Sequence, residues 1–282
     1  MASIEYSLFR TRFIKPFQLS IFQNDITPRD LFISALTERK SSTLRKGYVW
    51  HIGNTQYFSQ YRGYFAIGRT TTSTIEQYDE QSGNFIDQEL INSPYTHCVF
   101  DAAIGFIGIA QKTALSQSSK TVASRLEELL SLADVIKRNE VSIEIAPIPD
   151  PEDFIRTLNG AYRVMRFSAT FHGPNPFDAD EHFQKPLSVY LSKANGQKGR
   201  TLIQGDNLNR EVLQSVARST AATGNEASAR IVRRRSERPT TVNLKGDPVK
   251  RRYAEDEQNH EGILEDLTIL YRRVRDDRNS QD

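Results

Sequence analysis

Alternating polar and apolar positions, rich in aromatic and β-branched residues, recur along the first two thirds of the chain. Residues 4–14 (IEYSLFRTRFI) show this pattern most clearly. A period of two places successive side chains on opposite faces of an extended chain, as in a strand with one face on a core. The same pattern predicts strands at 48–52, 63–78, 141–148 and 162–172, with a short corner at 95–101 and a hairpin at 104–112.

Other segments carry apolar residues at helical spacing. Thr27, Pro28 and Asp30 predict a helix start, because a Thr cap, a Pro in the first turn and an acid near the positive end of the dipole favour that position. Residues 120–138 predict one further helix. The most regular apolar stripe predicts a helix near the C-terminus, formed by Ile263, Leu264, Leu267, Leu270, Tyr271 and Val274. Such a helix either closes the core or forms a two-fold dimer contact.

The order of these elements predicts an α+β fold, with a largely antiparallel sheet, helices on one side, and a smaller C-terminal α+β lobe. Gly173-Pro174-Asn175-Pro176 interrupts the pattern. We therefore expect an N-terminal α+β domain over 1–173. The C-terminal lobe over 174–282 would hold a basic strand pair and the terminal amphipathic helix.

The composition is that of a soluble protein of 282 residues with 38% apolar residues, which is enough for a substantial core. No apolar run reaches the roughly 18 residues that a membrane span needs. The N-terminus lacks the long apolar core of a signal peptide. The single cysteine, Cys98, excludes an internal disulfide. These features predict a cytoplasmic protein, and no motif predicts a cofactor.

Positive charge is concentrated in one stretch, residues 218–252, which holds ten Lys or Arg against three acids in a chain of formal net charge +2. Such a stretch favours a polyanion as ligand. Two strands, 227–235 and 240–245, are expected to display it. The alternative is a charged edge strand that prevents aggregation. The candidate nucleic-acid-binding residues are Arg230, Arg233, Arg234, Arg235, Arg238, Lys245, Lys250, Arg251 and Arg252. Without a groove-reading motif, we expect contacts with phosphates rather than bases.

Two other function classes stay open. A metal-dependent nuclease needs clustered carboxylates to hold Mg²⁺, and the densest group is Asp178, Asp180, Glu181 and His182, with His172 upstream. Acids before a helix are also common partners of its dipole. Residues 38–40 (Glu-Arg-Lys) match the Glu-x-Lys sequence of a common nuclease core, but they fall at the end of a predicted helix. The third class is an adaptor whose basic strands dock an acidic protein.

Two remaining clusters have structural as well as functional interpretations. His97, Cys98 and Asp101 resemble a nucleophile with its base, but adjacent strand residues point to opposite faces, so Cys98 is expected to be a buried apolar residue. Aromatic residues could stack on bases or pack in the core. They are Tyr57, Phe58, Tyr61, Tyr64 and Phe65.

The layout of the chain resembles the RexA-like phage-exclusion proteins of lambdoid prophages and the similar DNA-binding subunits of bacterial defence pairs. The resemblance covers about residues 45–200 and the last helix. It lies in the order of the segments YVWHI…YFAIG, HCVFD…IGFIGIAQK, VSIEIAPI, YRVMRFSATF, LSVYLSKANGQ and ILEDLTILYRRV.

This resemblance implies a cytosolic homodimer that binds DNA without sequence preference and signals to a separate membrane effector protein during phage infection. The Arg-rich residues 230–238 match no pattern of that family, so the candidate binding residues depend on charge alone. Together, the charge and the resemblance predict a non-enzymatic protein of anti-phage defence that binds nucleic acid, with DNA favoured over RNA.

Overall fold

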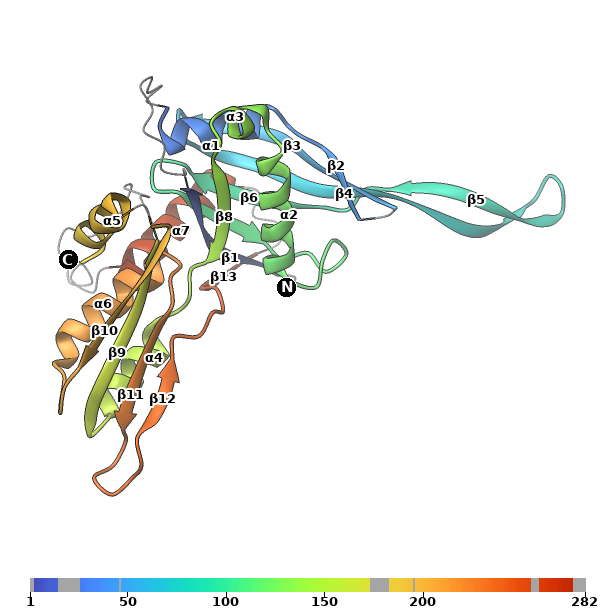
Figure 1. The fold of residues 1–282 in the computed structure, drawn as a ribbon. Coiled ribbons are helices and arrows are strands. Elements are labelled where there is room, and N and C mark those ends of the chain that lie inside the picture. The colour runs from blue at the N-terminus through green and yellow to red at the C-terminus, as the bar shows by residue number, and fades with distance from the viewer. Residues whose placement is uncertain are drawn as a thin grey trace.

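The computed structural model describes residues 3–14, 26–45, 47–172, 183–194, 196–254 and 259–275. It has the predicted α+β architecture, with two antiparallel sheets (Figure 1). The strands of the large sheet are β1 (Ser3–Ile14), β2 (Ser42–Arg45), β3 (Tyr48–Ser59), β4 (Arg62–Asp79), β5 (Asn84–Asn92), β6 (Tyr95–Asp101), β7 (Phe106–Ala110), β8 (Ser142–Pro147) and β13 (Lys250–Ala254). The small sheet contains β9 (Arg163–His172), β10 (Lys198–Gln204), β11 (Ala227–Val232) and β12 (Thr240–Asn243).

Helices cover both faces of the large sheet, whose main strand order is β13-β1-β7-β6-β4-β3-β2. Three helices share a core with one face: α1 (Pro28–Thr37), α2 (Ser119–Ser131) and α3 (Asp134–Arg138). The terminal helix α7 (His260–Arg275) packs on the other face through its apolar stripe. Its buried Ile263, Leu267 and Tyr271 therefore close a core, which is one of the two roles that the sequence left open.

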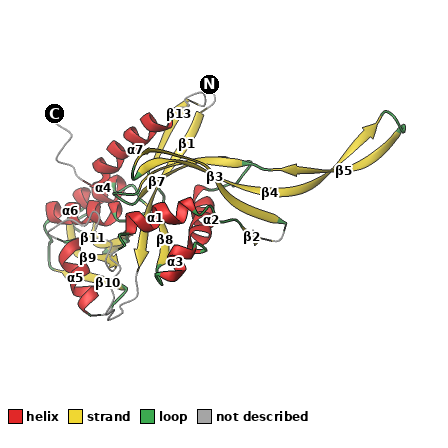
Figure 2. Ribbon diagram, turned by 90° about the horizontal axis from the view of Figure 1, so that it is seen from above, coloured by secondary structure: helices red, strands yellow, loops and turns green. Residues whose placement is uncertain are grey.

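A long two-stranded arm extends from the large sheet (Figures 1 and 2). It is formed where β4 runs past its neighbours β3 and β6, so that residues 71–79 pair only with 84–92 of β5. Gly83, with φ +70°, completes the turn between the strands. Nearly every side chain of the arm is exposed. The arm is a feature that the sequence did not predict.

The small sheet has the order β10-β9-β11-β12, and the helices among the described residues cover only one of its faces. Its apolar residues Phe167, Ala169 and Ile231 pack against α4 (Glu152–Gly160) and α6 (Arg210–Ala222). A third helix, α5 (Gln184–Lys193), lies beside β9. The other face of the sheet is open (Figure 1).

Several local predictions were wrong. Residues 95–101 form a full strand that pairs with β4 and β7, rather than a corner. The helix predicted over 120–138 breaks before Asp134, because the Glu38 carboxylate accepts hydrogen bonds from Asp134 N and Val135 N at 2.7 and 2.9 Å and caps a separate α3. Residues 42–45 form β2, a strand that the sequence pattern did not predict.

The strands of the two sheets do not follow the predicted division of the chain at residue 173. β9, which precedes that position, belongs to the small sheet, whereas β13 and α7 return from the C-terminal part to the large one. The predicted boundary itself, 173–176, lies outside the described residues. No described helix is both long and apolar enough to cross a membrane.

Candidate nucleic-acid interface

The open face of the small sheet is lined by cationic and hydroxyl side chains. Strand alternation directs Phe167, Ala169 and Phe171 of β9 to the helices, and therefore directs Arg166, Ser168 and Thr170 outward. On the neighbouring strands, Arg200 lies opposite Thr170, and Arg230 opposite Arg166. Lys198 lies opposite His172. We call the surface formed by Arg166, Lys198, Arg200 and Arg230 the basic face.

The end of the basic face that holds Lys198 and Arg200 borders an open depression of about 730 Å³. Hydroxyl and amide groups that can donate to phosphate oxygens line it, together with Lys198 and Arg200. Glu226 is the one acidic residue among its lining residues. The polar lining residues are Ser168, Thr170, Ser228 and Asn243.

Two arginines of the basic face, Arg166 and Arg200, are held by neutral partners. Arg200 Nε donates to Ser168 Oγ. When the side-chain amide of Gln204 is oriented with its oxygen toward Arg166, that oxygen accepts hydrogen bonds from Arg166 Nε and Nη2 at 2.8 and 2.7 Å. Within the described part of the chain, none of the four cations forms an ion pair with a carboxylate. Their charge is therefore available to an external anion.

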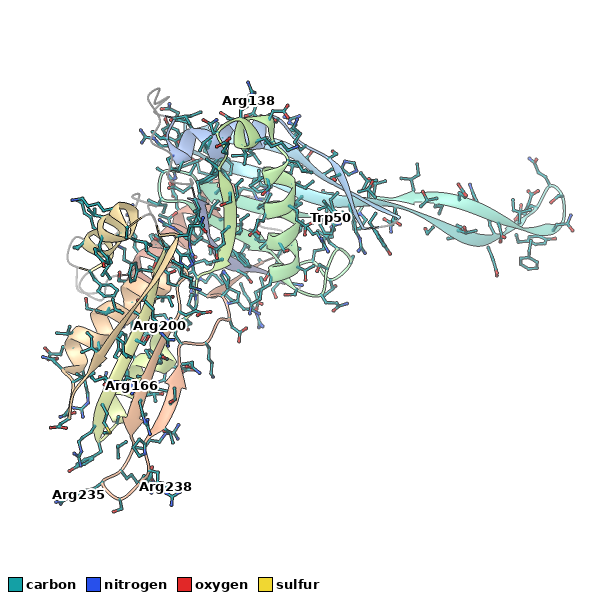
Figure 3. All side chains as sticks on the ribbon, viewed as in Figure 1. Trp50, Arg138, Arg166, Arg200, Arg235 and Arg238 are labelled. Atoms are coloured by element: carbon teal, nitrogen blue, oxygen red, sulfur yellow. The ribbon has the colours of Figure 1, made fainter. Side chains whose placement is uncertain are left out.

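The loop between β11 and β12 extends the basic face to the end of the small lobe (Figure 3). This tip loop, residues 233–239, exposes four arginines: Arg233, Arg234, Arg235 and Arg238. Only Arg234 among them has a carboxylate nearby within the described residues, Glu237 at 3.7 Å. The predicted strand over 227–235 ends at Val232, so Arg233, Arg234 and Arg235 lie in the tip loop and not on a strand.

The remaining candidate residues lie elsewhere. Lys250 and Arg252 of β13 both pair with Glu5, at 2.7 and 3.0 Å, and Arg251 pairs with Asp266 at 3.2 Å. The hydrogen bond from Lys250, together with Arg252, keeps the pKa of Glu5 below its usual value despite partial burial. Lys245 lies 3.9 Å from Asp153. Each of these cations therefore has a carboxylate nearby, although Lys250 and Arg252 share one, and β13 belongs to the other sheet.

Sequence reasoning missed Arg166, Lys198 and Arg200, which lie far from the basic stretch in sequence. The available signal was the alternation in 162–172 (YRVMRFSATFH), which places Arg166, Ser168 and Thr170 on one face. Their pairing with Arg230 could not be read from one sequence, because it depends on which strands meet. The first residue of the basic stretch, Arg218, is buried and bonded to Glu152 at 2.7 Å.

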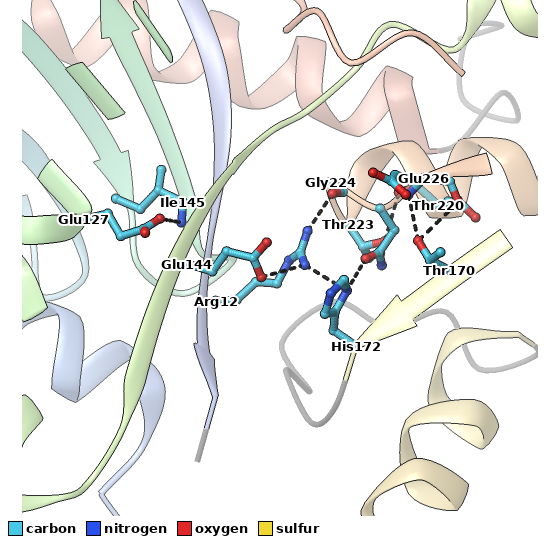
Figure 4. Close-up of polar contacts among 11 residues, drawn as sticks. Arg12, Glu127, Glu144, Ile145, Thr170, His172, Thr220, Thr223, Gly224 and Glu226 are labelled. Carbon is cyan, nitrogen blue, oxygen red and sulfur yellow. Dashed lines mark hydrogen bonds and ion pairs between the residues drawn. The ribbon is translucent and has the colours of Figure 1, made fainter. Parts of the chain in front are cut away.

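A partly buried polar cluster joins the two sheets near the inner end of β9 (Figure 4). Arg12 of β1 bonds Glu144 at 3.0 Å, donates to the carbonyl of Gly224 at 2.5 Å, and lies 2.9 Å from His172 Nδ1. His172 Nδ1 is also 2.5 Å from Asn225 Oδ1. Burial and the charge of Arg12 lower the pKa of His172. A neutral His172 therefore fits beside the guanidinium.

The described residues do not form the metal site that a metal-dependent nuclease needs. Asp178, Asp180, Glu181 and His182 lie outside them, and the described part of the chain contains no group of three potential metal ligands. Glu38 caps α3, as described above. Cys98 is fully buried, and burial raises the pKa of its thiol, which confirms the expectation of an unreactive apolar residue.

The aromatic candidates lie away from the basic face, on the large sheet. Phe65 is fully buried, and Tyr61 donates to Asp30 Oδ1 at 3.0 Å. Tyr64 stacks on His260 of α7 with ring centroids 4.1 Å apart. Tyr57 is the exposed member of the group.

The sequence matches no protein-family model and no curated protein.

Proposed function

We propose that this chain is a cytoplasmic protein that binds nucleic acid without sequence preference, with duplex DNA favoured over RNA. The observation that carries this proposal is the open basic face, whose four cations have no carboxylate partner among the described residues and continue into the four exposed arginines of the tip loop. The surface is about 33 Å long along β9 and about 15 Å across its four strands, which is large enough for several consecutive phosphates.

The expected mode of binding is phosphate contact. Arginine forks and hydroxyl donors suit phosphate oxygens, and release of condensed counterions supplies most of the affinity. A flat, open sheet face lacks the helix or ribbon that enters a groove to read base edges. Sequence preference is therefore expected to be weak. The resemblance described above adds a context, anti-phage defence with a separate membrane effector, and this context is part of the proposal.

A salt titration of binding to a labelled duplex of random sequence tests the proposal. Reversing three charges of the basic face (R166E/R200E/R230E) or of the tip loop (R233E/R235E/R238E) is expected to weaken binding at least about tenfold. It should also reduce the slope of log K against log salt by roughly 2–3, because each lost phosphate contact removes about 0.9 of slope. Matched Arg→Gln variants repeat the test with a milder change.

The control reverses three exposed cations remote from this surface, Lys137 and Arg138 of α3 and Arg273 of α7 (K137E/R138E/R273E). It changes the net charge by the same amount and is expected to bind nearly as the wild type does. Folding of every variant is checked by far-UV circular dichroism. Wild-type affinity and salt slope in both the face and the tip variants would refute the proposal. A duplex RNA of the same length measures the expected preference for DNA.

A further inference from the structure

The arm carries a charge opposite to that of the basic face. Residues 70–93 contain no Lys or Arg and five carboxylates. They are Glu76, Asp79, Glu80, Asp87 and Glu89. An exposed hairpin of this charge is unsuited to nucleic acid, because phosphates repel it.

The carboxylates are distributed unequally between the two faces of the arm. Glu76 lies directly opposite Asp87 in the register, and Glu89 follows two positions along on the same face. Like charges on directly opposed strand positions destabilise a hairpin, so the stability of the arm does not explain why this face carries three carboxylates. On the other face, the one carboxylate is Asp79. A hydrogen bond from the Ser82 side chain, together with those from the turn amides of Gln81 and Ser82, lowers the pKa of Asp79.

Large exposed apolar side chains flank the acidic group on the same face. Phe85, 79% exposed, packs against Tyr78 at the tip end, with ring centroids 5.3 Å apart. Ile91, 76% exposed, lies toward the base of the arm. We call the surface formed by Glu76, Asp87, Glu89 and these apolar residues the arm face. An acidic centre between apolar ends is typical of a surface that docks a cationic partner.

We propose that the arm face docks on the basic face of a second copy of this chain. The two surfaces are complementary in charge, and both are about 30 Å long, since nine strand residues of the arm meet a ten-residue β9. Leu202, 55% exposed on the outer side of β10, offers the basic face an apolar contact.

The arm does not reach the basic face of its own chain, so a contact between these two surfaces requires a second copy. In both ribbon views the arm extends away from the small sheet (Figures 1 and 2). If each of two copies docks its arm on the other, the assembly closes by a two-fold axis. Two such contacts bury in total about 1,200 Å² for a face of about 30 by 10 Å, which is the lower end of the range for specific interfaces.

Self-association would cover the basic face and so compete with nucleic acid for it. This competition alone rests on the proposed function. The docking itself is tested without nucleic acid, by sedimentation velocity of the full chain over a range of protein and salt concentrations. The wild type is expected to form a dimer at low salt that dissociates as salt is raised. A wild type that stays monomeric at low salt would overturn the proposal.

Three comparisons make the test specific. Neutralising the arm face (E76Q/D87N/E89Q) is expected to weaken the dimer about tenfold. Adding the same change of charge to the opposite arm face (S73K/Q77K/Q88K) leaves the acidic surface intact and should weaken it far less. Combining a reversed arm (E76K/D87K/E89K) with a reversed basic face (R166E/R200E/R230E) in one chain should restore the dimer that each reversal alone abolishes.

A dimer whose dissociation constant is unchanged by neutralising the arm face would overturn the proposal, as would failure of the combined reversal to restore association in a folded chain. The outcome is independent of the binding experiments above. A chain that binds DNA but stays monomeric would contradict only the proposed docking of the arm face. A chain that forms a salt-sensitive dimer but does not bind DNA would contradict only the proposed function.

Discussion

Arg12 connects the two sheets, and replacing it by Met should destabilise the fold by about 2–4 kcal/mol. The side chain is 4% exposed, and its guanidinium contacts Glu144 of β8, His172 of β9 and the Gly224 carbonyl at the end of α6. Losing a hydrogen bond to a charged group costs about 1.5–3 kcal/mol, and an orphaned buried carbonyl costs about 1–3 kcal/mol.

Two features reduce this cost. Glu144 is 40% exposed, so water can solvate its carboxylate after the substitution. The Arg12 Nε is buried without a hydrogen-bond partner among the described residues, and Met removes that desolvated donor. The expected loss of about 2–4 kcal/mol is therefore centred below the roughly 3–5 kcal/mol typical of breaking a fully buried ion pair.

Chemical denaturation followed by two probes measures the effect. The single tryptophan, Trp50, is buried in the core of the large sheet and reports on that sheet by fluorescence, while far-UV circular dichroism reports on the whole chain. We expect the midpoint of Arg12→Met to fall for both probes. The circular dichroism transition should begin first, because the small sheet loses its anchor to β1.

Arg156→Met provides the control, since its side chain is 78% exposed and pairs only with Asp153 one helical turn away among the described residues. Its cost should stay below about 0.5 kcal/mol. The reasoning is refuted if Arg12→Met costs no more than Arg156→Met, or if its two transitions shift equally and by less than about 1 kcal/mol.

Two further predictions concern pH and packing. Because the pKa of His172 is lowered in the fold, the unfolded chain binds a proton more readily, so stability present above about pH 6.5 is lost as the pH falls below that value. The denaturation midpoint of His172→Asn should therefore fall less than that of the wild type between pH 7.5 and 5.5. The pKa values of His97 and His260 are also lowered, so part of the pH dependence should remain in this variant. Gly108→Ala should cost about 1–3 kcal/mol, because its Cβ would lie 2.7 Å from a leucine methyl of α7, whereas Gly160→Ala, which meets nothing within 4 Å, should cost nothing measurable by the same denaturation assay.

The sequence determined features that depend on neighbouring residues. Side-chain period is a local property, so the alternation at 4–14, 63–78 and 162–172 predicted β1, β4 and β9 closely. The Thr27 cap is present, with Asp30 N 3.4 Å from its hydroxyl, and the terminal amphipathic stripe forms α7. The α+β class follows from these elements alone.

Tertiary structure decided what depends on which segments meet. The basic stretch is continuous in sequence, yet β11 pairs with β9 and β13 pairs with β1, so its cations belong to two sheets. Lys250 and Arg252 meet the carboxylate of Glu5, whereas Arg230 meets another arginine, Arg166. Strand partners are chosen by long-range burial of apolar faces, which one sequence does not reveal. For the same reason, the basic face and the arm could be recognised only in the folded chain.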